Sequence, residues 1–223
     1  MKFRRWKKRL LLIASGIAVV LLSFYLLQRF WAHRSDAFAS GTETVCAPLL
    51  GWFTREDRRV SPWPPLTDVQ PGDILLTLST HTAGWRHGHT GLVINENTVL
   101  ECAMLGTDSA LTGIDHWRSY SSYAVLRLKD ITPEQQAEIV AFALEDLTGV
   151  PYRLTAGLWG EKFLAPEEAG FGLHCTYLVW YAYFRFGYDL DSDGGRLVSA
   201  ADLLQSDRLE IVQIYGMDPR EFL

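Results

Sequence analysis

Short apolar runs separated by turn residues dominate the chain from residue 71 onward, and this alternation is typical of β-strands. Runs rich in Val, Ile and Leu predict five strands: DILLTLS (73–79), HTGLVIN (89–95), TVLECA (98–103), AVLRLK (124–129) and LEIVQIY (209–215). Gly, Asp and Asn residues between the runs supply turns. The pattern therefore predicts a domain built around a sheet.

One longer segment, residues 132–149, has the signals of a helix. Thr132 is its expected N-cap, Pro133 occupies the first helical position, and Gly149 follows its end. Its apolar residues recur at helical spacing and predict one buried stripe: Ala137, Val140, Ala141, Leu144 and Leu147.

A second helix is predicted from Cys175 to about Phe186, with Gly187 as its C-terminal stop. The segment CTYLVWYAYF is almost entirely apolar or aromatic, so it is expected to be buried against the sheet. Strands and helices together predict an α+β domain at residues 71–223, with a mostly antiparallel sheet packed on helices.

The N-terminal part predicts a membrane anchor. Residues 1–9, MKFRRWKKR, hold six Lys or Arg and form a basic cytoplasmic tail, and the eighteen residues after them carry no charge. Such a run is close to the ~30 Å hydrocarbon thickness, so residues 10–31 are expected to be a transmembrane helix. Residues 32–70, polar and rich in proline near their end, are then a tether. A cleaved signal peptide is the alternative.

The expected location is the inner (cell) membrane, single-pass, with the domain extracytoplasmic or periplasmic. Without the six cations of the tail, 15 basic residues face 26 acidic ones, a charge of about −11. No basic surface remains to neutralise phosphates, which excludes nucleic acid as a partner. Charge says nothing further about the chemistry.

Three cysteines are present: Cys46, Cys102 and Cys175. In an oxidising compartment an even set is normally paired, so one thiol is left over. Either Cys46 pairs with Cys102 and leaves Cys175 free, or all three are unpaired thiols, mostly buried.

Cys175, His89 and Glu101 are the residue types of a thiol nucleophile, its base and an orienting group. A thiolate gains from a nearby cation and from the positive end of a helix, where Cys175 is predicted to lie. A histidine partner needs a group that orients its second nitrogen. A buried packing role for the cysteine is the alternative.

His89 and Glu101 can interact only if they share one face of the sheet. If residues 95–97 (NEN) form a three-residue loop, Gly91 pairs with Glu101, and His89 lies diagonally opposite that carboxylate. Gly91 then leaves room for the carboxylate. A two- or four-residue loop would flip the parity and separate the two side chains. The same parity places Cys102 on the other face.

The ordered set PGDILLTLS, HTGLVI, VLEC, a helix, GVPY, HCTYLVWYAY and SAADLLQSDRLEIV resembles the circularly permuted papain-like amidases, the YiiX-like branch of the NlpC-type cysteine peptidases. The resemblance covers about residues 70–212. It implies a permuted papain-like fold in which Cys175 is the nucleophile, His89 the base and Glu101 the third member. Tyr152, in GVPY, matches a position near the site and would bind substrate or pack in the core.

The function expected from this resemblance is a membrane-anchored extracytoplasmic cysteine hydrolase. It would cleave an amide, in cell-wall peptide or in a lipid-linked acyl group, without a cofactor. HCTYLVWYAY also resembles the cysteine helix of the lecithin:retinol acyltransferase group, so a lipid acyltransferase or phospholipase is the alternative enzyme. There the third member is usually histidine, and Glu101 favours the amidase. A catalytically silent, membrane-tethered binding module is the alternative outside enzymes.

Two motifs suggest metals, and neither fits well. His81, His87 and His89 lack the supporting ligands of a zinc site, and His87 is instead expected to line the substrate entrance. The segment DLDSDG, from Asp189 to Gly194, matches the start of a calcium loop. Its twelfth position is alanine rather than glutamate, which favours a solvated turn. No metal is therefore expected.

Overall fold

The computed structural model describes residues 6, 9, 13–23, 43–46, 55–58, 66–81, 87–157 and 172–218, the short strands before residue 66 by their backbone only. A six-stranded antiparallel sheet in the order β7-β6-β5-β3-β8-β9 forms its centre. Its strands are β3 (Ile74–Thr77), β5 (His89–Asn95), β6 (Thr98–Glu101), β7 (Ala110–Gly113), β8 (Tyr123–Leu128) and β9 (Leu209–Tyr215). The five predicted strands are confirmed, and β7 adds an edge strand that the sequence did not indicate.

A second, smaller sheet joins part of the expected tether to the domain. It contains β1 (Glu43–Cys46), β2 (Arg55–Arg58) and β4 (Thr80–His81), in that order. Both contacts are antiparallel, and β2 pairs with β4 through Arg55 opposite His81. Residues before 71 therefore add strands next to the central domain.

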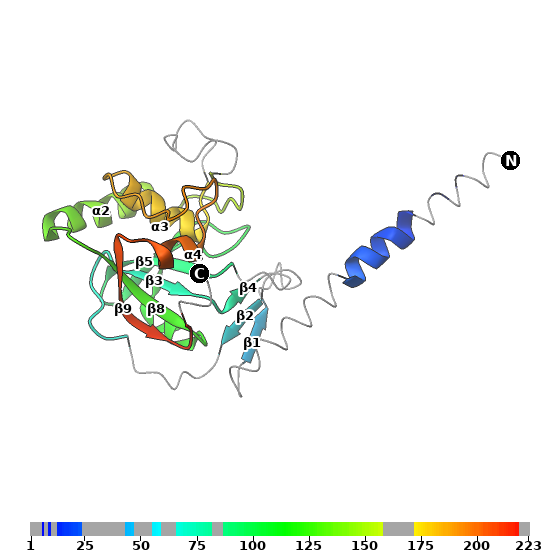
Figure 1. The fold of residues 1–223 in the computed structure, drawn as a ribbon, viewed down its shortest axis with the longest axis horizontal. Helices are drawn as coiled ribbons and strands as arrows, with labels where there is room; N and C mark the ends of the chain where they lie inside the picture. The colour runs from blue at the N-terminus through cyan, green and yellow to red at the C-terminus, as the bar shows by residue number, and fades with distance from the viewer. Residues whose placement is uncertain are drawn as a thin grey trace.

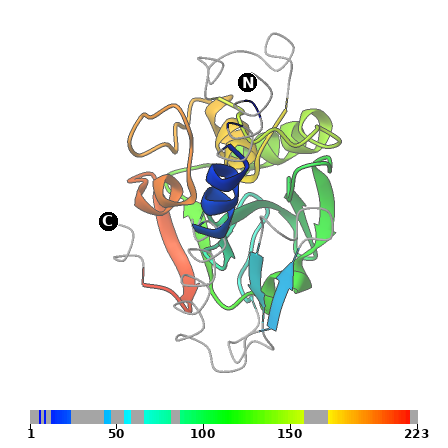
Figure 2. The ribbon, with the colours of Figure 1, turned by 90° about the vertical axis from the view of Figure 1, so that its right-hand side faces the viewer.

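Three helices cover one face of the six-stranded sheet (Figure 1). They are α2 (Pro133–Asp146), α3 (Cys175–Phe184) and α4 (Ala200–Gln205). Figure 2 shows α2 and α3 side by side, and α3 packs against β5. Leu178, Val179 and Ala182 of α3 are buried in the larger core between these layers, as predicted. This packing fixes the position at which α3 begins.

The ends of α2 follow the sequence signals, and its buried face follows them in part: Val140 and Leu147 of the predicted stripe are buried. Thr132 caps the helix in a reciprocal capping box, and Gly149 adopts a positive φ of 77° after its end. Three residues of the predicted stripe are exposed: Ala137, Ala141 and Leu144. The helix buries Ile139 and Ala143 instead. Turning the large Ile139 toward the sheet buries more apolar area than turning two alanines toward it.

The opposite face of the sheet carries a smaller core. It contains Leu75, Val93, Val99 and Val125 of the sheet, covered by Trp117 and Tyr120. Trp117 lies in a short 3₁₀ helix, η1 (Ile114–Ser119), which follows β7 and was not predicted. Leu66 and Val69 pack against the same cluster. The odd-numbered residues of β5 face this smaller core.

The β5–β6 hairpin keeps its predicted register with a different turn. The turn holds two residues, 96–97, rather than the predicted three. A bulge at Ile94 leaves one residue of β5 without a partner in the ladder. The extra residue offsets the shorter turn, so Gly91 still pairs with Glu101. The predicted loop length is wrong, and the pairing that it was meant to produce is confirmed.

A buried ion pair ties β3 to β8. Asp73 is fully buried just before β3, and Arg127 donates to its two carboxylate oxygens at 2.7 and 2.8 Å. The backbone N–H of Gln70 donates to the same carboxylate at 2.7 Å. The aspartate of the PGD motif therefore has a structural role in closing the turn into β3.

The predicted transmembrane helix at residues 10–31 is wrong. Of the predicted span, the structure describes residues 13–23, and these are helical. None of the helices in the described part of the chain combines the length and apolar character that a membrane crossing requires. Figure 1 shows this helix apart from the central sheet.

Candidate active site

The start of β5, the end of β6 and the start of α3 come together at one end of the β5–β6 strand pair. His89 is the first residue of β5, Glu101 is the last residue of β6, and Cys175 is the first residue of α3. Because β5 and β6 are antiparallel, the start of one lies beside the end of the other. The structure therefore brings together the three residues that the sequence singled out, and all three are buried.

His89 lies between the thiol and the carboxylate. Its Nε2 contacts Glu101 Oε2 at 2.6 Å, and the ring also interacts with the Cys175 thiol. Burial opposes protonation of the ring, but the interactions with Cys175 and Glu101 outweigh burial and raise the pKa of His89 to about 10. His89 is therefore an imidazolium at neutral pH.

Cys175 carries the matching negative charge. Burial opposes its ionisation, but interactions with His174 and His89 lower the pKa of the thiol well below its ordinary value. His174 is the N-cap of α3, and its ring accepts a hydrogen bond from the backbone N–H of Tyr177 at 3.3 Å. The first N–H groups of a helix have no partner within it, so their partial positive charge also lies beside the thiolate.

Glu101 has partners beyond His89. Its Oε1 accepts a hydrogen bond from the Thr112 hydroxyl and lies 3.2 Å from His116 Nε2. Burial favours the protonated acid, but the hydrogen bonds to His116 and His89 prevail and lower the pKa of Glu101. Sequence reasoning missed Thr112 and His116, because they lie in β7 and η1, which gave no strand or helix signal.

Trp117 and Gly91 shape the space around the histidine and the carboxylate. The Trp117 ring stacks on the His89 ring with 5.4 Å between centroids and 13° between planes. A side chain at Gly91 would meet both Trp117 and Glu101. The stacked ring keeps water from the His89–Glu101 pair, which strengthens their electrostatic interaction.

Tyr152 and His87 are the predicted substrate-binding residues. Tyr152 forms an isolated parallel β-bridge with Leu173, which lies two residues before Cys175. Burial raises the pKa of its hydroxyl, and the electrostatic interaction with Cys175 raises it further. His87 is half-buried, and its Nδ1 contacts the Gly88 carbonyl oxygen at 2.7 Å. The role of either residue in binding stays a prediction.

Cys102 is a buried free thiol, so of the two alternatives for the cysteines the Cys46–Cys102 pairing is excluded. Its Sγ–H donates to the Leu173 carbonyl at 3.2 Å, and burial raises its pKa to about 12. As predicted, Cys102 faces the larger core, opposite to Glu101. Its burial and raised pKa make Cys102 an unreactive thiol.

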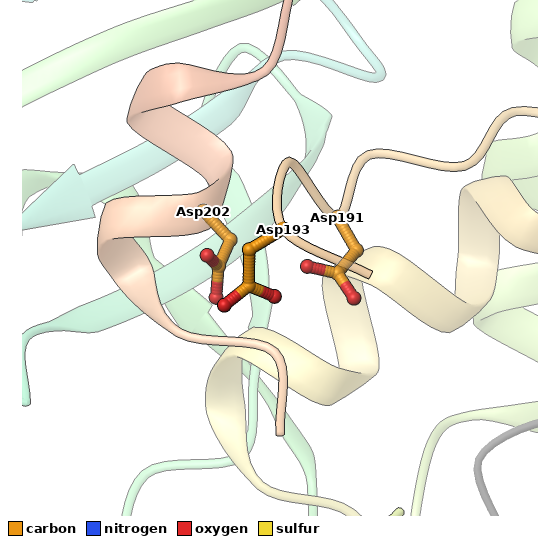
Figure 3. Close-up of side chains that lie close together, drawn as sticks. All are labelled: Asp191, Asp193 and Asp202. Atoms are coloured by element: carbon orange, nitrogen blue, oxygen red, sulfur yellow. The ribbon is translucent and has the colours of Figure 1, made fainter. Parts of the chain in front are cut away.

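Within the described residues, one group of side chains could hold a metal ion: Asp191, Asp193 and Asp202 (Figure 3). One ligand atom from each lies within 4.8 Å of the others. Asp202 belongs to α4, outside the segment 189–194 that matches the start of a calcium loop, and accepts the Ser199 N–H at 2.6 Å as part of a helix cap. Asp189 lies outside the cluster and accepts from Trp180 Nε1 at 2.7 Å.

The three-histidine zinc interpretation has no support in the described residues. His89 is engaged by Glu101 and Cys175, and it joins no metal-binding group with another histidine there. The side chain of His81 lies outside the described residues.

No family model matches the chain, and no curated protein matches it. A crystal structure described as the metalloprotein YiiX from Escherichia coli O157:H7 is similar, with 17% sequence identity and a TM-score of 0.49. The match covers 65% of this chain and 96% of that chain.

Proposed function

We propose that the chain is a thiol hydrolase that cleaves an amide bond through a Cys175–His89–Glu101 triad and an acyl-enzyme. One observation carries the proposal: the His89 Nε2 lies 2.6 Å from Glu101 Oε2, and the same ring interacts electrostatically with Cys175. A nucleophile in reach of a base that a third group orients is the arrangement that nucleophilic catalysis requires. The sequence resemblance to permuted papain-like amidases supports the same reaction.

In the first half-reaction the Cys175 thiolate attacks the carbonyl carbon of the amide. The sulfur–carbon bond forms, and the carbonyl oxygen becomes an oxyanion. The Cys175 backbone N–H at the start of α3 would stabilise that oxyanion. His89 then gives its proton to the amine as the carbon–nitrogen bond breaks, which leaves an acyl-thioester on Cys175.

In the second half-reaction water replaces the amine. Neutral His89 takes a proton from the water, whose oxygen attacks the thioester carbon and releases the acid. The thiolate and the imidazolium are restored together. Glu101 stays ionised throughout and holds the His89 ring in its orientation, because its two oxygens are bound on both sides.

The lipid acyltransferase remains the alternative enzyme, and it would use the same thiolate and histidine. The third member of the site distinguishes the two groups, and here it is a carboxylate that contacts His89 at 2.6 Å. This contact supports the amidase. A silent binding module is less well supported, since an ion pair buried without catalytic use would cost stability.

Product analysis tests the proposal. The full chain and Cys175→Ala are incubated separately with peptidoglycan fragments, N-acyl amides and phospholipids, and the products are weighed by mass spectrometry. We expect amide cleavage by the parent and an acyl mass on the Cys175 peptide at short times. Cys102→Ala, which removes the buried thiol, is the matched control and should keep the activity. Equal products from the parent and Cys175→Ala would refute the mechanism.

A further inference from the structure

His116 occupies a position that the triad alone does not explain. It lies in η1, beyond β7, and its Nε2 is 3.2 Å from the Glu101 oxygen that His89 does not use. The two histidines therefore hold opposite oxygens of one buried carboxylate. His116 is the more accessible of the two, with 29% of its side chain exposed.

The hydrogen bonds of His116 define its protonation state. Its Nδ1 lies 2.7 Å from the Gly113 carbonyl oxygen, and a carbonyl oxygen can only accept. Its Nε2 faces an ionised carboxylate, which also can only accept. Both ring nitrogens must therefore carry hydrogen, and this makes His116 an imidazolium.

The buried charges of Cys175, His89 and Glu101 do not balance without His116. The Cys175 thiolate and Glu101 contribute two negative charges, and His89 contributes one positive charge between them. Without a second cation this buried cluster would carry a net charge of −1, which desolvation penalises. A protonated His116 brings the cluster to neutrality at the end farthest from the thiol.

We infer that His116 is a fourth member of the site, a protonated positioning residue that orients Glu101 and balances its charge for His89. The inference rests on the proposed function, because it assigns His116 a role in that triad. Burial lowers the pKa of His116, but its bonds to Glu101 and Gly113 outweigh burial and raise that pKa, in agreement with the geometry.

Other groups around His116 fit this assignment. Glu101 on β6 favours its charged form, His89 on β5 opposes it, and the Tyr120 ring lies 6.0 Å away in an edge-on contact. Its own helix carries Asp115 and Arg118, which offset each other. Glu101 is therefore the dominant charge that His116 meets.

Variants at position 116 separate charge from shape. His116→Gln keeps a hydrogen-bond donor without the charge, and His116→Lys keeps the charge. Arg118→Gln is the control, because it removes one positive charge from an exposed residue of the same helix. The measurement is the rate of Cys175 alkylation by iodoacetamide between pH 3 and 10, read by mass spectrometry on the full chain.

In His116→Gln we expect the acid limb of alkylation to move up by about 0.5–1 pH unit, because a positive charge roughly 10 Å from the thiol is lost. At a fixed pH on that limb the rate falls about three- to tenfold. His116→Lys and Arg118→Gln should keep the parent profile. A parent profile in His116→Gln would overturn the inference, and a shift in Arg118→Gln would show a field effect without a specific role.

A second measurement needs no change to the parent. In ¹⁵N-labelled protein at pH 7, both ring nitrogens of His116 should show the shifts of protonated nitrogens, with the signals assigned by their loss in His116→Gln. A neutral His116 ring at this pH would also overturn the inference. If instead the parent Cys175 titrates as an ordinary thiol, the proposed function fails, and the ¹⁵N shifts still decide the state of His116.

Discussion

Gly91 lies directly opposite Glu101 in the β5–β6 pair, and its lack of a side chain gives the carboxylate its place. A Cβ at Gly91 would lie 3.0 Å from Glu101 Cγ and 3.2 Å from the Trp117 ring, and it would overlap Val99. The position thus supports both the orientation of Glu101 and the stacking of Trp117 on His89.

Gly91→Ala should therefore harm the site and the fold together. We expect a loss of about 1–3 kcal/mol in the free energy of unfolding, from overpacking, measured by urea denaturation. Cys175 alkylation should shift toward higher pH because His89 loses its orientation. Gly113→Ala is the control, since a Cβ there meets nothing within 4 Å. Equal effects of the two changes would contradict this account.

The pH dependence of hydrolysis should be bell-shaped with a wide plateau. Its acid limb reports the Cys175 thiol, whose pKa lies well below the ordinary ~8.5 because His174 and His89 outweigh burial. Its alkaline limb should lie near pH 10, where His89 loses the proton that the leaving amine needs. Alkylation should stay high above pH 10, because the thiolate persists. An acid limb near pH 8.5 would contradict the thiolate–imidazolium pair.

The free energy of unfolding should also depend on pH through the ionisation of His89 and Cys175. The pKa of His89 is raised on folding, so its contribution to stability is complete below the unfolded value of ~6.5 and is lost as the pH rises through about 10. The pKa of Cys175 is lowered on folding, so its contribution grows with pH up to the unfolded value of ~8.5 and offsets the His89 loss up to that pH. Urea unfolding of the parent should therefore lose stability mainly above about pH 8.5, whereas in Cys175→Ala the loss should begin near pH ~6.5. The comparison uses the parent protein at matched pH.

His174 should affect both the thiol and the helix, and two variants separate these effects. His174→Asn keeps an N-cap acceptor but removes the histidine beside the thiol, so the pKa of Cys175 should rise at nearly unchanged stability. His174→Ala should raise the pKa similarly and also lose about 1 kcal/mol of stability. Alkylation against pH and urea unfolding measure the two. An unchanged acid limb in both variants would exclude His174 as a cause of the low pKa.

Breaking the Asp73–Arg127 pair should destabilise the domain without involving the site. Asp73→Ala leaves Arg127 without its main partner and should cost about 3–5 kcal/mol in urea unfolding. The double variant Asp73→Ala/Arg127→Met should recover part of this loss, because no unpaired charge remains. If the single and double variants are equally unstable, the loss has a different origin from the ion pair.

The residue types of the site could be read from the sequence, because each lies at the end of an element with a strong local signal. The apolar run after His89, the run before Glu101 and the apolar helix after Cys175 all formed where predicted. The ends of α2 could also be predicted from the sequence, because Thr132 and Gly149 mark them through local backbone geometry alone.

What the sequence did not indicate depends on contacts between distant segments. The bulge at Ile94 has no residue signature, since it reflects the joint fit of a turn and two twisted strands. His116 follows β7, an edge strand whose side chains are mostly exposed and whose pattern lacks apolar alternation. The part of the buried face of α2 that differs from the predicted stripe likewise follows from the shape of the sheet rather than from helical spacing.

The compact hairpin that holds His89 and Glu101 also bears on the order of folding. These two side chains are twelve residues apart, so their contact requires only a local loop closure, which is fast in small hairpins at about 1–10 μs. Cys175 joins them only after β8 and α2 have been traversed along the chain. The His89–Glu101 contact therefore needs a much shorter loop to close than the approach of Cys175, which depends on the docking of α3 against β5.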